Sequence, residues 1–165
     1  VYNSREDNSV SNVADLTELG REMGFDVLAA PLGTDDEPSA DDIAPAVAEL
    51  ARKGADILYI GPDNFIGNYR DTLTDAGFAN GLAAFSATEL EVRDGHAMLG
   101  LVSRYELVGR LAASKVEQIL IGGISPADIP VETLDRFSYL IRLSSARKLK
   151  LYPPLSLLDY AEVIE

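Results

Sequence analysis

Three short polar clusters hold the side chains best suited to binding chemistry in this sequence. They are Asn8-Ser9, Asp63-Asn64 and Thr88-Glu89. Each cluster follows an apolar run of strand length and lies where a helical pattern begins. Amide, hydroxyl and carboxylate groups at such positions orient a polar ligand through hydrogen bonds. The same groups also satisfy the free N–H groups at a helix N-terminus, so helix capping is the alternative interpretation of each cluster taken singly.

No catalytic or metal-binding arrangement accompanies these clusters. The chain has no cysteine, and its one histidine, His96, begins an apolar run without a second histidine to complete a metal site. Glycine-rich nucleotide motifs and the nucleophile elbow of hydrolases are absent. The acidic run over residues 35–42 lacks the ligand spacing of a calcium loop. We therefore expect a protein that is not an enzyme and that uses no metal or cofactor.

The length of the chain indicates how many domains it forms, and its net charge indicates which partners it can bind. The 165 residues are enough for one domain with a sizeable core. The formal net charge is −13 and is spread along the chain, so it repels nucleic-acid phosphates and anionic lipids. No apolar run approaches the length that spans a bilayer. Nucleic acid is therefore not an expected partner.

Helical patterns alternate with strand-length apolar runs over the first hundred residues. Helices are predicted over 9–23, with Ser9 as N-cap and Gly24 as its end, and over 42–53 and 64–76, which end at Gly54 and Gly77. Strands are predicted over 25–30, 55–60 and 82–86, and residues 1–3 look like the end of a strand that begins upstream. Such alternation predicts an α/β fold with a parallel Rossmann-like sheet and helices on both faces.

The pattern changes after Gly95. We expect a strand over 96–102, a long helix over 105–121, a strand over 137–143 and a short helix over 144–149. The last stretch, 155–165, is short and acidic and does not look like a further strand–helix unit. Because ligands bind outside the carboxyl ends of parallel strands, the three polar clusters should meet at one edge of the sheet.

These segments also carry a family resemblance. The matching stretches are Tyr2 to Ser9, Ala55 to Asn64, Phe85 to Gly95, Tyr105 to Arg110 and Pro126 to Thr133, and the ending Ala161 to Glu165 looks like a natural C-terminus. In this order and spacing, over almost the whole chain, the sequence resembles the ABC-transporter substrate-binding family with the type I periplasmic-binding-protein fold. Some members of that family take up aromatic amino acids.

The resemblance implies a clamshell of two α/β lobes that holds a solute in its cleft. Residues 1–102 would form the second lobe, 103–136 a helix and loop of the first lobe, and 137–165 a crossover strand, a short helix and the C-terminal tail. These crossover segments would belong to or contact a first lobe whose main part, like any export signal, would lie upstream. Asn8, Ser9, Asp63, Asn64 and Glu89 match positions that line the family's cleft.

The implied role is capture of a small polar solute, an amino acid or a small carboxylate, for a membrane ABC permease. The protein would be periplasmic or otherwise extracytoplasmic, with or without a lipoprotein anchor. Two alternatives stay open. One is a ligand-sensing domain of a signalling receptor with the same fold. The other is a flavodoxin-like enzyme or regulator, for which neither Lys53 nor Lys115 is suitably placed.

Two positions depart from the family pattern. Many relatives carry an acid where this chain has Thr88, and an Asp-Tyr pair where it has Arg104-Tyr105. Loss of a cleft acid weakens the case for an amino-group ligand. Arg104 has two interpretations. Its guanidinium group binds carboxylates, which would favour an anionic ligand. Alternatively, Arg104 is an exposed surface residue at the hinge with a structural role.

Overall fold

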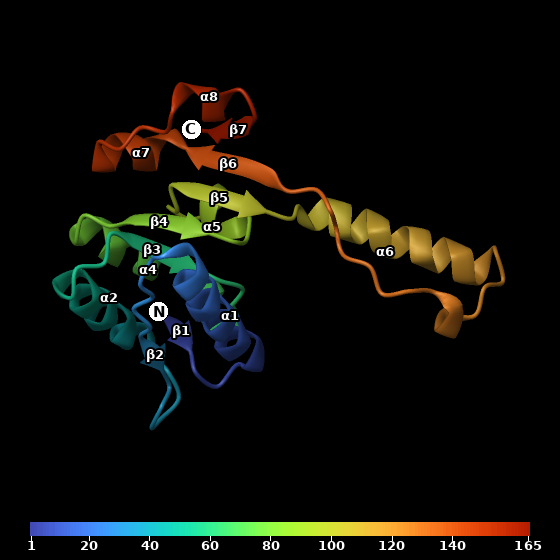
Figure 1. Ribbon diagram of the computed structural model, residues 1–165, viewed down its shortest axis with the longest axis horizontal. Coiled ribbons are helices and arrows are strands. Elements are labelled where there is room, and N and C mark those ends of the chain that lie inside the picture. The colour runs from blue at the N-terminus through green and yellow to red at the C-terminus, as the bar shows by residue number, and fades with distance from the viewer.

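The computed structural model describes residues 1–165, which form a mixed α/β fold with one long projecting helix (Figure 1). The strands are β1 (Tyr2–Asn3), β2 (Pro31–Leu32), β3 (Ile57–Ile60), β4 (Ala83–Ser86), β5 (Leu99–Val102), β6 (Ser138–Arg142) and β7 (Ala161–Ile164). The helices are α1 (Asp7–Met23), α2 (Ile43–Arg52), α3 (Asn64–Asn68), α4 (Arg70–Ala79), α5 (Leu90–Arg93), α6 (Tyr105–Leu120), α7 (Leu143–Leu149) and α8 (Leu155–Leu158). Single 3-10 turns lie at Ala40–Asp42 and Pro126–Asp128. None of the helices is both long and apolar enough to cross a membrane.

The main sheet has five strands in the order β3-β4-β5-β6-β7, and β1 and β2 form a separate parallel pair. Within the main sheet only β5 and β6 run antiparallel. Parallel neighbours need a crossover, which α4 and α5 supply early in the chain. The long excursion through α6 brings β6 back in the opposite direction. The predicted α/β class with a mostly parallel sheet is confirmed.

The core lies between one face of the main sheet and the helices α2, α3 and α4. Strand β3 directs Leu58 and Ile60 to this face by the two-residue alternation of a strand. Helix α2 meets them with Ile43 and Val47, which are one turn apart, and α4 adds the buried Leu73. Burial of each such side chain contributes about 1.5–3 kcal/mol.

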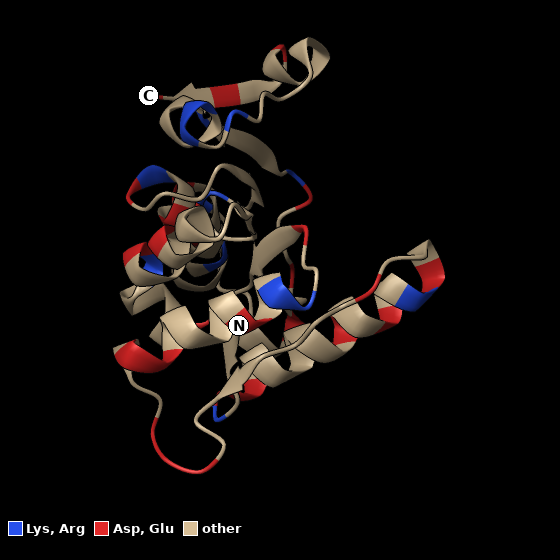
Figure 2. Cartoon of the chain, turned by 90° about the vertical axis from the view of Figure 1, so that its left-hand side faces the viewer, with Lys and Arg blue, Asp and Glu red and all other residues tan.

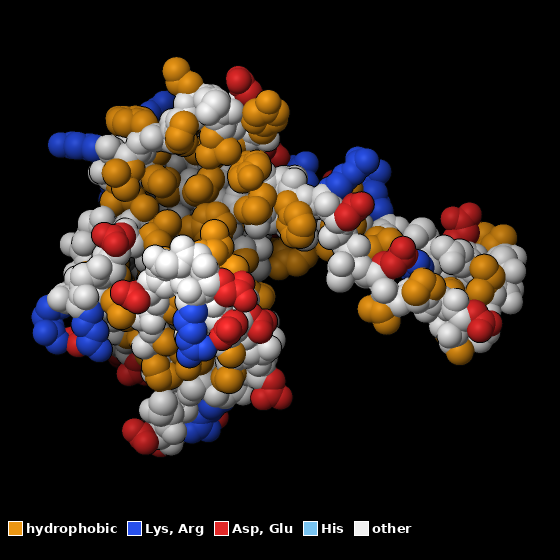
Figure 3. All heavy atoms as spheres, in the orientation of Figure 1, with side chains coloured by type: hydrophobic (Ala, Val, Ile, Leu, Met, Phe, Trp, Pro, Cys, Tyr) orange, Lys and Arg blue, Asp and Glu red, His pale blue; other side chains and the backbone are white.

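The opposite face of the sheet is apolar but largely uncovered. Leu101, Tyr139 and Val163 share this face by register and are 37%, 39% and 42% exposed. Figure 3 shows hydrophobic side chains gathered over this upper-left part of the molecule. Helix α1 lies on the same side beside β3, where a hollow separates it from Tyr59 and Phe85. Helix α1 therefore covers part of this face at the β3 end of the sheet.

Helix α6 projects away from the sheet, and the chain returns beside it (Figure 1). None of its residues is buried, and Leu120 and Ile121 at its far end are 77% and 81% exposed. We call residues 103–136 the arm. Figure 2 shows acidic residues on α6 as well as on the body of the fold, so the net charge is distributed as the sequence indicated.

The predicted strand over residues 25–30 is wrong. Only Pro31 and Leu32 pair with β1, and residues 26–29 make no backbone hydrogen bond. The apolar pattern that predicted a strand is present, but no second strand lies beside it. The glycines that follow α1 and α2, Gly24 and Gly54, do adopt the predicted left-handed backbone, with φ of 80° and 90°.

The predicted helix over 64–76 is two helices. Tyr69, at φ −112° and ψ 28°, separates α3 from α4, and α4 continues to Ala79. Gly77 does not end the helix. A Cβ at Gly77 would lie 3.4 Å from the Leu58 side chain, so this glycine allows α4 to approach β3 closely.

The prediction that the C-terminal stretch contains no further strand–helix unit is also wrong. Strand β7 pairs in parallel with β6, and α7 and α8 connect the two strands. The apolar pattern did not predict this strand because the strand contains an acid, Glu162. In the folded chain the Glu162 carboxylate is paired with Arg93 and Arg104. The C-terminal segments therefore extend the same sheet as β3, β4 and β5.

Candidate ligand-binding edge of the sheet

Apart from the buried Ser9, the residues of the three predicted clusters lie at one edge of the fold, as the strand alternation predicted. The loops after β1, β3, β4 and β5, residues 4–6, 61–63, 87–89 and 103–104, form what we call the strand-end edge. Hydrogen bonds join Asn3 at the end of β1 to Asp63, Glu6 to Asn64 at the start of α3, and Glu89 to Tyr105 at the start of α6. The two pairs of loops meet where α3 approaches α5. A Cβ added at Gly67 of α3 would lie 3.6 Å from the Glu91 carboxylate of α5.

Asp63 is held by structural contacts on both carboxylate oxygens. Its Oδ1 accepts the N–H of Ile66 at 2.8 Å and so caps α3. Its Oδ2 accepts the N–H of Asn3 at 2.7 Å. The first contact is the capping role, and the second ties β1 to the loop after β3. Asp63 therefore fixes two loops of the strand-end edge relative to each other.

Glu6 places a carboxylate in front of α3. Its Oε1 accepts the Phe65 N–H at 3.1 Å and the Asn3 Nδ2 at 3.0 Å. Its Oε2 accepts the Asn64 N–H at 3.0 Å and the Asn64 Nδ2 at 3.1 Å. Burial by itself would raise the pKa of Glu6, but these four hydrogen bonds outweigh burial and hold the pKa below its ordinary value of 4.5.

Asn8 and Ser9 lie in the first turn of α1 but in different surroundings. Asn8 is exposed, and its Nδ2 donates to the carbonyl of Pro62 at 2.7 Å. Ser9 is 3% exposed and its hydroxyl has no hydrogen-bond partner. The prediction that Ser9 caps the helix is wrong, because α1 begins at Asp7 and its N-cap residue is Glu6. Ser9 lines the hollow beneath α1 rather than the exposed part of the strand-end edge.

Thr88 contacts a buried acid that the sequence analysis did not single out. The Thr88 hydroxyl donates to Oε2 of Glu91, which also accepts from the Ser86 hydroxyl at 3.3 Å. The Thr88 N–H in turn donates to Ser86 Oγ at 3.1 Å. Glu91 is only 5% exposed. A carboxylate is thus present beside position 88, although the residue at that position is not itself an acid.

Glu89 binds the start of the arm. Its Oε1 accepts the N–H of Tyr105, in the first turn of α6, at 2.9 Å, and its Oε2 accepts from Arg93 Nε at 3.2 Å. A helix N-terminus favours an anion at this place. Burial, followed by the negative charges of Glu91 and Glu89, raises the pKa of Tyr105. Glu89 therefore joins the loop after β4 to the loop after β5.

Arg104 pairs with the last strand. Its Nη2 lies 2.6 Å from Oε2 of Glu162, which also binds Arg93. The hydrogen bond from Arg93 is the main effect that lowers the pKa of Glu162, against burial, and the same bond raises the pKa of Arg93. Of the two interpretations of Arg104, these contacts support the structural one at the base of the arm.

The arrangement offers hydrogen bonds rather than catalytic chemistry. The carboxylates of Glu6, Asp63 and Glu89 are satisfied within the chain, whereas the amide oxygens of Asn8 and Asn64 accept no hydrogen bond from it. No group of three or more His, Cys, Asp or Glu side chains is placed to hold a metal ion. Free acceptors on exposed asparagines, backed by bound carboxylates, suit a polar ligand with N–H donors.

Three solved structures superpose on almost the whole chain. They are a conserved domain protein from Vibrio cholerae (22% identity, TM-score 0.84), an ABC domain in complex with L-Trp from Streptococcus pneumonia (23%, 0.82) and a ligand-free, open substrate-binding protein with adhesive properties from Clostridium difficile (22%, 0.78). At these identities the likeness establishes the fold alone. Each match covers 99% of this chain but only 53%, 53% and 52% of the other, so this chain spans about half the length of the structures it matches.

The chain matches a protein family, although it matches no single curated protein. The family profile described as ABC transporter substrate binding protein matches residues 1–164. Because that match spans nearly all of the sequence, the chain belongs to the ABC transporter substrate-binding protein family.

Proposed function

We propose that this chain supplies the second lobe of an extracytoplasmic solute-binding protein of an ABC importer. The lobe would capture a small polar solute, an amino acid or a small carboxylate, and a membrane permease would receive it. The observation that carries this proposal is the strand-end edge, where four loops bring three polar clusters together in a chain of this family. A ligand in that position would lie outside the carboxyl ends of the strands.

We assign different tasks to the six predicted site residues. Asn8 and Asn64 are exposed and keep a free amide oxygen each, so they contact the solute directly. Thr88 presents the Glu91 carboxylate to the same edge. Asp63 and Glu89 hold the loops through Asn3 and Tyr105. Ser9 is buried in the first turn of α1 and is not assigned a contact with the solute.

The nearby carboxylate of Glu91 bears on the class of solute. An acid at the binding edge suits the ammonium group of an amino acid, because opposite charges attract strongly where water is excluded. The structural neighbour from Streptococcus pneumonia is described in complex with L-Trp, which is a precedent for an amino acid in this fold. We therefore favour an amino acid over a simple carboxylate.

The arm is proposed to belong to a first lobe. Residues 103–136 leave the sheet, bury no residue of α6 and return at β6. The exposed Leu120 and Ile121 would be covered by that lobe. On this proposal residues 1–102 form the second lobe, and residues 137–165 cross back to it. Closure of two lobes about such crossings would trap the solute without a chemical reaction.

A ligand screen on the full-length protein tests the proposal. Thermal unfolding is followed with each of the common amino acids and with a set of small carboxylates. A specific amino acid is expected to raise the Tm in a concentration-dependent way, because a ligand that binds only the folded state stabilises it. Absence of any stabilising compound, together with covalent modification by a phosphoryl donor and Mg²⁺, would contradict solute binding.

A further inference from the structure

Glu91 is a buried acid without a positively charged partner. Only 5% of it is exposed, and no Lys, Arg or His nitrogen lies within 4 Å of its carboxylate. Glu89, two residues earlier and 9% exposed, is paired with Arg93. Buried charges are ordinarily paired, because water no longer solvates them. The Glu91 carboxylate therefore lacks a cation that this chain does not supply.

The hydroxyl groups around Glu91 contact only one of its two oxygens. Oε2 accepts from the Thr88 hydroxyl and lies 3.3 Å from Ser86 Oγ, whose single proton is nearer to the Thr88 carbonyl at 3.0 Å. Oε1 accepts no hydrogen bond from the chain. Ser9 Oγ is the only fully enclosed side-chain atom without a partner, so the unpaired Oε1 of Glu91 reaches the surface.

The free oxygen faces a gap that a glycine leaves open. A Cβ added at Gly67 of α3 would lie 3.6 Å from Glu91 Oε1, and no other atom from another element lies within 4 Å of that Cβ position. Asn64 is three residues before Gly67, so the two residues lie on the same side of α3. An ammonium group in this gap would therefore lie beside both Oε1 and Asn64.

Three guanidinium groups lie on neighbouring segments, but none of them pairs with Glu91. Arg70 donates from Nη1 to the Gly67 carbonyl at 2.5 Å. Arg93 and Arg104 are both held by Glu162. The negative charge of Glu91 is felt instead by Tyr105, since burial and then the charges of Glu91 and Glu89 raise the pKa of the Tyr105 phenol. An aromatic ring at this place also suits a cation.

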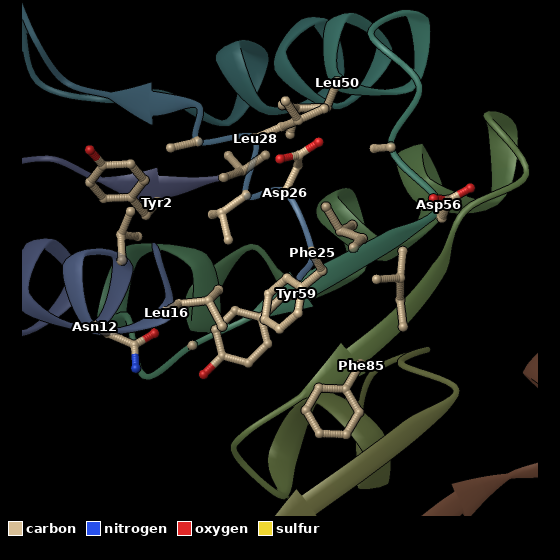
Figure 4. A pocket seen from close by; sticks show the side chains of 18 of the residues that line it. Tyr2, Asn12, Leu16, Phe25, Asp26, Leu28, Leu50, Asp56, Tyr59 and Phe85 are labelled. Carbon is tan, nitrogen blue, oxygen red and sulfur yellow. The ribbon is translucent and has the colours of Figure 1, made fainter. Parts of the chain in front are cut away.

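The apolar hollow beneath α1 is a different space. Leu16, Leu28 and Tyr59 point into it (Figure 4), and its walls include neither Glu91 nor Gly67. The unpaired carboxylate is therefore reached from the strand-end edge and not through the hollow.

We propose that Glu91 binds the positively charged amino group of the solute in the gap at Gly67, between α3 and α5. This inference rests on the proposed function and restricts its solutes to amino acids and other amines. Thr88 orients the carboxylate through Oε2, which leaves Oε1 to the solute. A small carboxylate without an amino group leaves the charge of Glu91 unpaired and adds a second negative charge, so it is not a solute.

A matched pair of acid variants gives the first test, in the full-length protein freed of bound solute by unfolding and refolding. Glu91→Gln keeps an acceptor for Thr88 and removes the unpaired charge, so its Tm is expected to equal or exceed that of the native protein. Glu89→Gln loses a charge that is paired with Arg93 and is expected to lower the Tm. An equal decrease in both variants would show that Glu91 is neutralised within the protein and would overturn the proposal.

Pairs of amino acids and α-hydroxy acids with the same side chain give the second test. Calorimetric titration is expected to show that the bound amino acid binds about 100-fold more tightly than its hydroxy acid, and that Glu91→Gln removes most of this difference. Equal affinities of the two compounds for the native protein would overturn this inference and leave solute binding intact. Binding of neither these compounds nor any other small polar solute would contradict the proposed function as well.

Gly67→Ala gives the third test, because it fills the gap without a change of charge. Gly67 is not among the glycines with positive φ, so its backbone accepts alanine. The variant is expected to bind the amino acid at least about tenfold more weakly at an unchanged or slightly higher Tm. Asn68→Ala, at the next residue of α3, is the control and should bind like the native protein. Native affinity in Gly67→Ala would overturn the placement of the amino group between α3 and α5.

Discussion

The guanidinium group of Arg93 binds both carboxylate oxygens of Glu162, with Nη1–Oε1 and Nη2–Oε2 distances of 2.8 Å each. Arg93 ends the short helix α5, and Glu162 lies on β7, the last strand. Arg104 adds a second cation at 2.6 Å, at the base of the arm. The bidentate geometry is the strongest form of such a pair. One carboxylate therefore connects the end of the chain to the point where the arm leaves the sheet.

Glu162→Gln should lower the free energy of unfolding by about 1 kcal/mol, because one acceptor for two guanidinium groups is lost while solvent screens part of the effect. Urea denaturation at pH 7 measures this change. Glu106→Gln is the matched control, since Glu106 pairs with Arg110 on the exposed surface of α6. The control should change stability by less than about 0.5 kcal/mol. Equal losses in the two variants would contradict a structural role for the Glu162 pair.

The stability of the fold should decrease in acid. The pKa values of Glu6 and Glu162 are both held below the ordinary value of 4.5 in the folded state. A lowered pKa means that the stabilisation is complete above the unfolded value and is lost as the pH falls through the folded value. Urea denaturation between pH 7 and pH 3 should therefore show a loss that begins near pH 4.5. The Glu6→Gln variant should show a smaller loss than the native protein, and an unchanged pH dependence would rule out this role of Glu6.

Asp63→Ala should lower the free energy of unfolding by about 1–2 kcal/mol, because it removes the cap of α3 and the bond to the Asn3 N–H. Asp63→Asn should lose less, since its amide oxygen still caps Ile66 while its NH2 group cannot accept from Asn3. Thermal or urea denaturation compares the two variants. If Asp63→Ala unfolds like the native protein but binds solute weakly, the carboxylate contacts the solute and is not a structural support.

Alanine substitutions at Gly100 and Gly109 should change the free energy of unfolding in opposite directions. A Cβ at Gly100 on β5 would lie 2.9 Å from Val92 Cγ2 and 3.1 Å from the Ser86 carbonyl oxygen, so Gly100→Ala should cost about 1–3 kcal/mol. A Cβ at Gly109 on α6 meets nothing within 4 Å. Gly109→Ala should stabilise the helix by about 0.5–1 kcal/mol, because alanine has the higher helix propensity. Denaturation of both variants checks the packing of the sheet, and stabilisation by Gly100→Ala would contradict it.

Much of the fold could be predicted from local patterns. Helix α2 follows from its apolar spacing and from Gly54, and β3 follows from an uninterrupted apolar run. The incorrect predictions concern segments whose structure depends on contacts with residues far away in the sequence. Residues 25–30 have the composition of a strand but no strand beside them, and β7 has an acidic residue that is neutralised by two arginines from elsewhere in the chain.

The sequence predicted where the candidate site lies but not which contacts its side chains make. The clusters at Asn8, Asp63 and Thr88 reach the same edge because parallel strands end together. The partners of those side chains were not predictable, because they are distant in sequence or buried by packing. Glu91, for example, lies three residues beyond Thr88 and carries no local pattern that separates it from a solvated helix residue.

Calorimetric titration of the full-length protein with the amino acid identified by the thermal screen tests the central claim most directly. Asn8→Ala and Asn64→Ala should each weaken binding by about tenfold or more, which corresponds to about 1.4 kcal/mol. Asn68→Ala, at the far end of α3, is the control and should bind like the native protein. Unchanged affinity in both site variants, or no binding of any small polar solute by the native protein, would contradict the claim that the strand-end edge is a solute-binding surface.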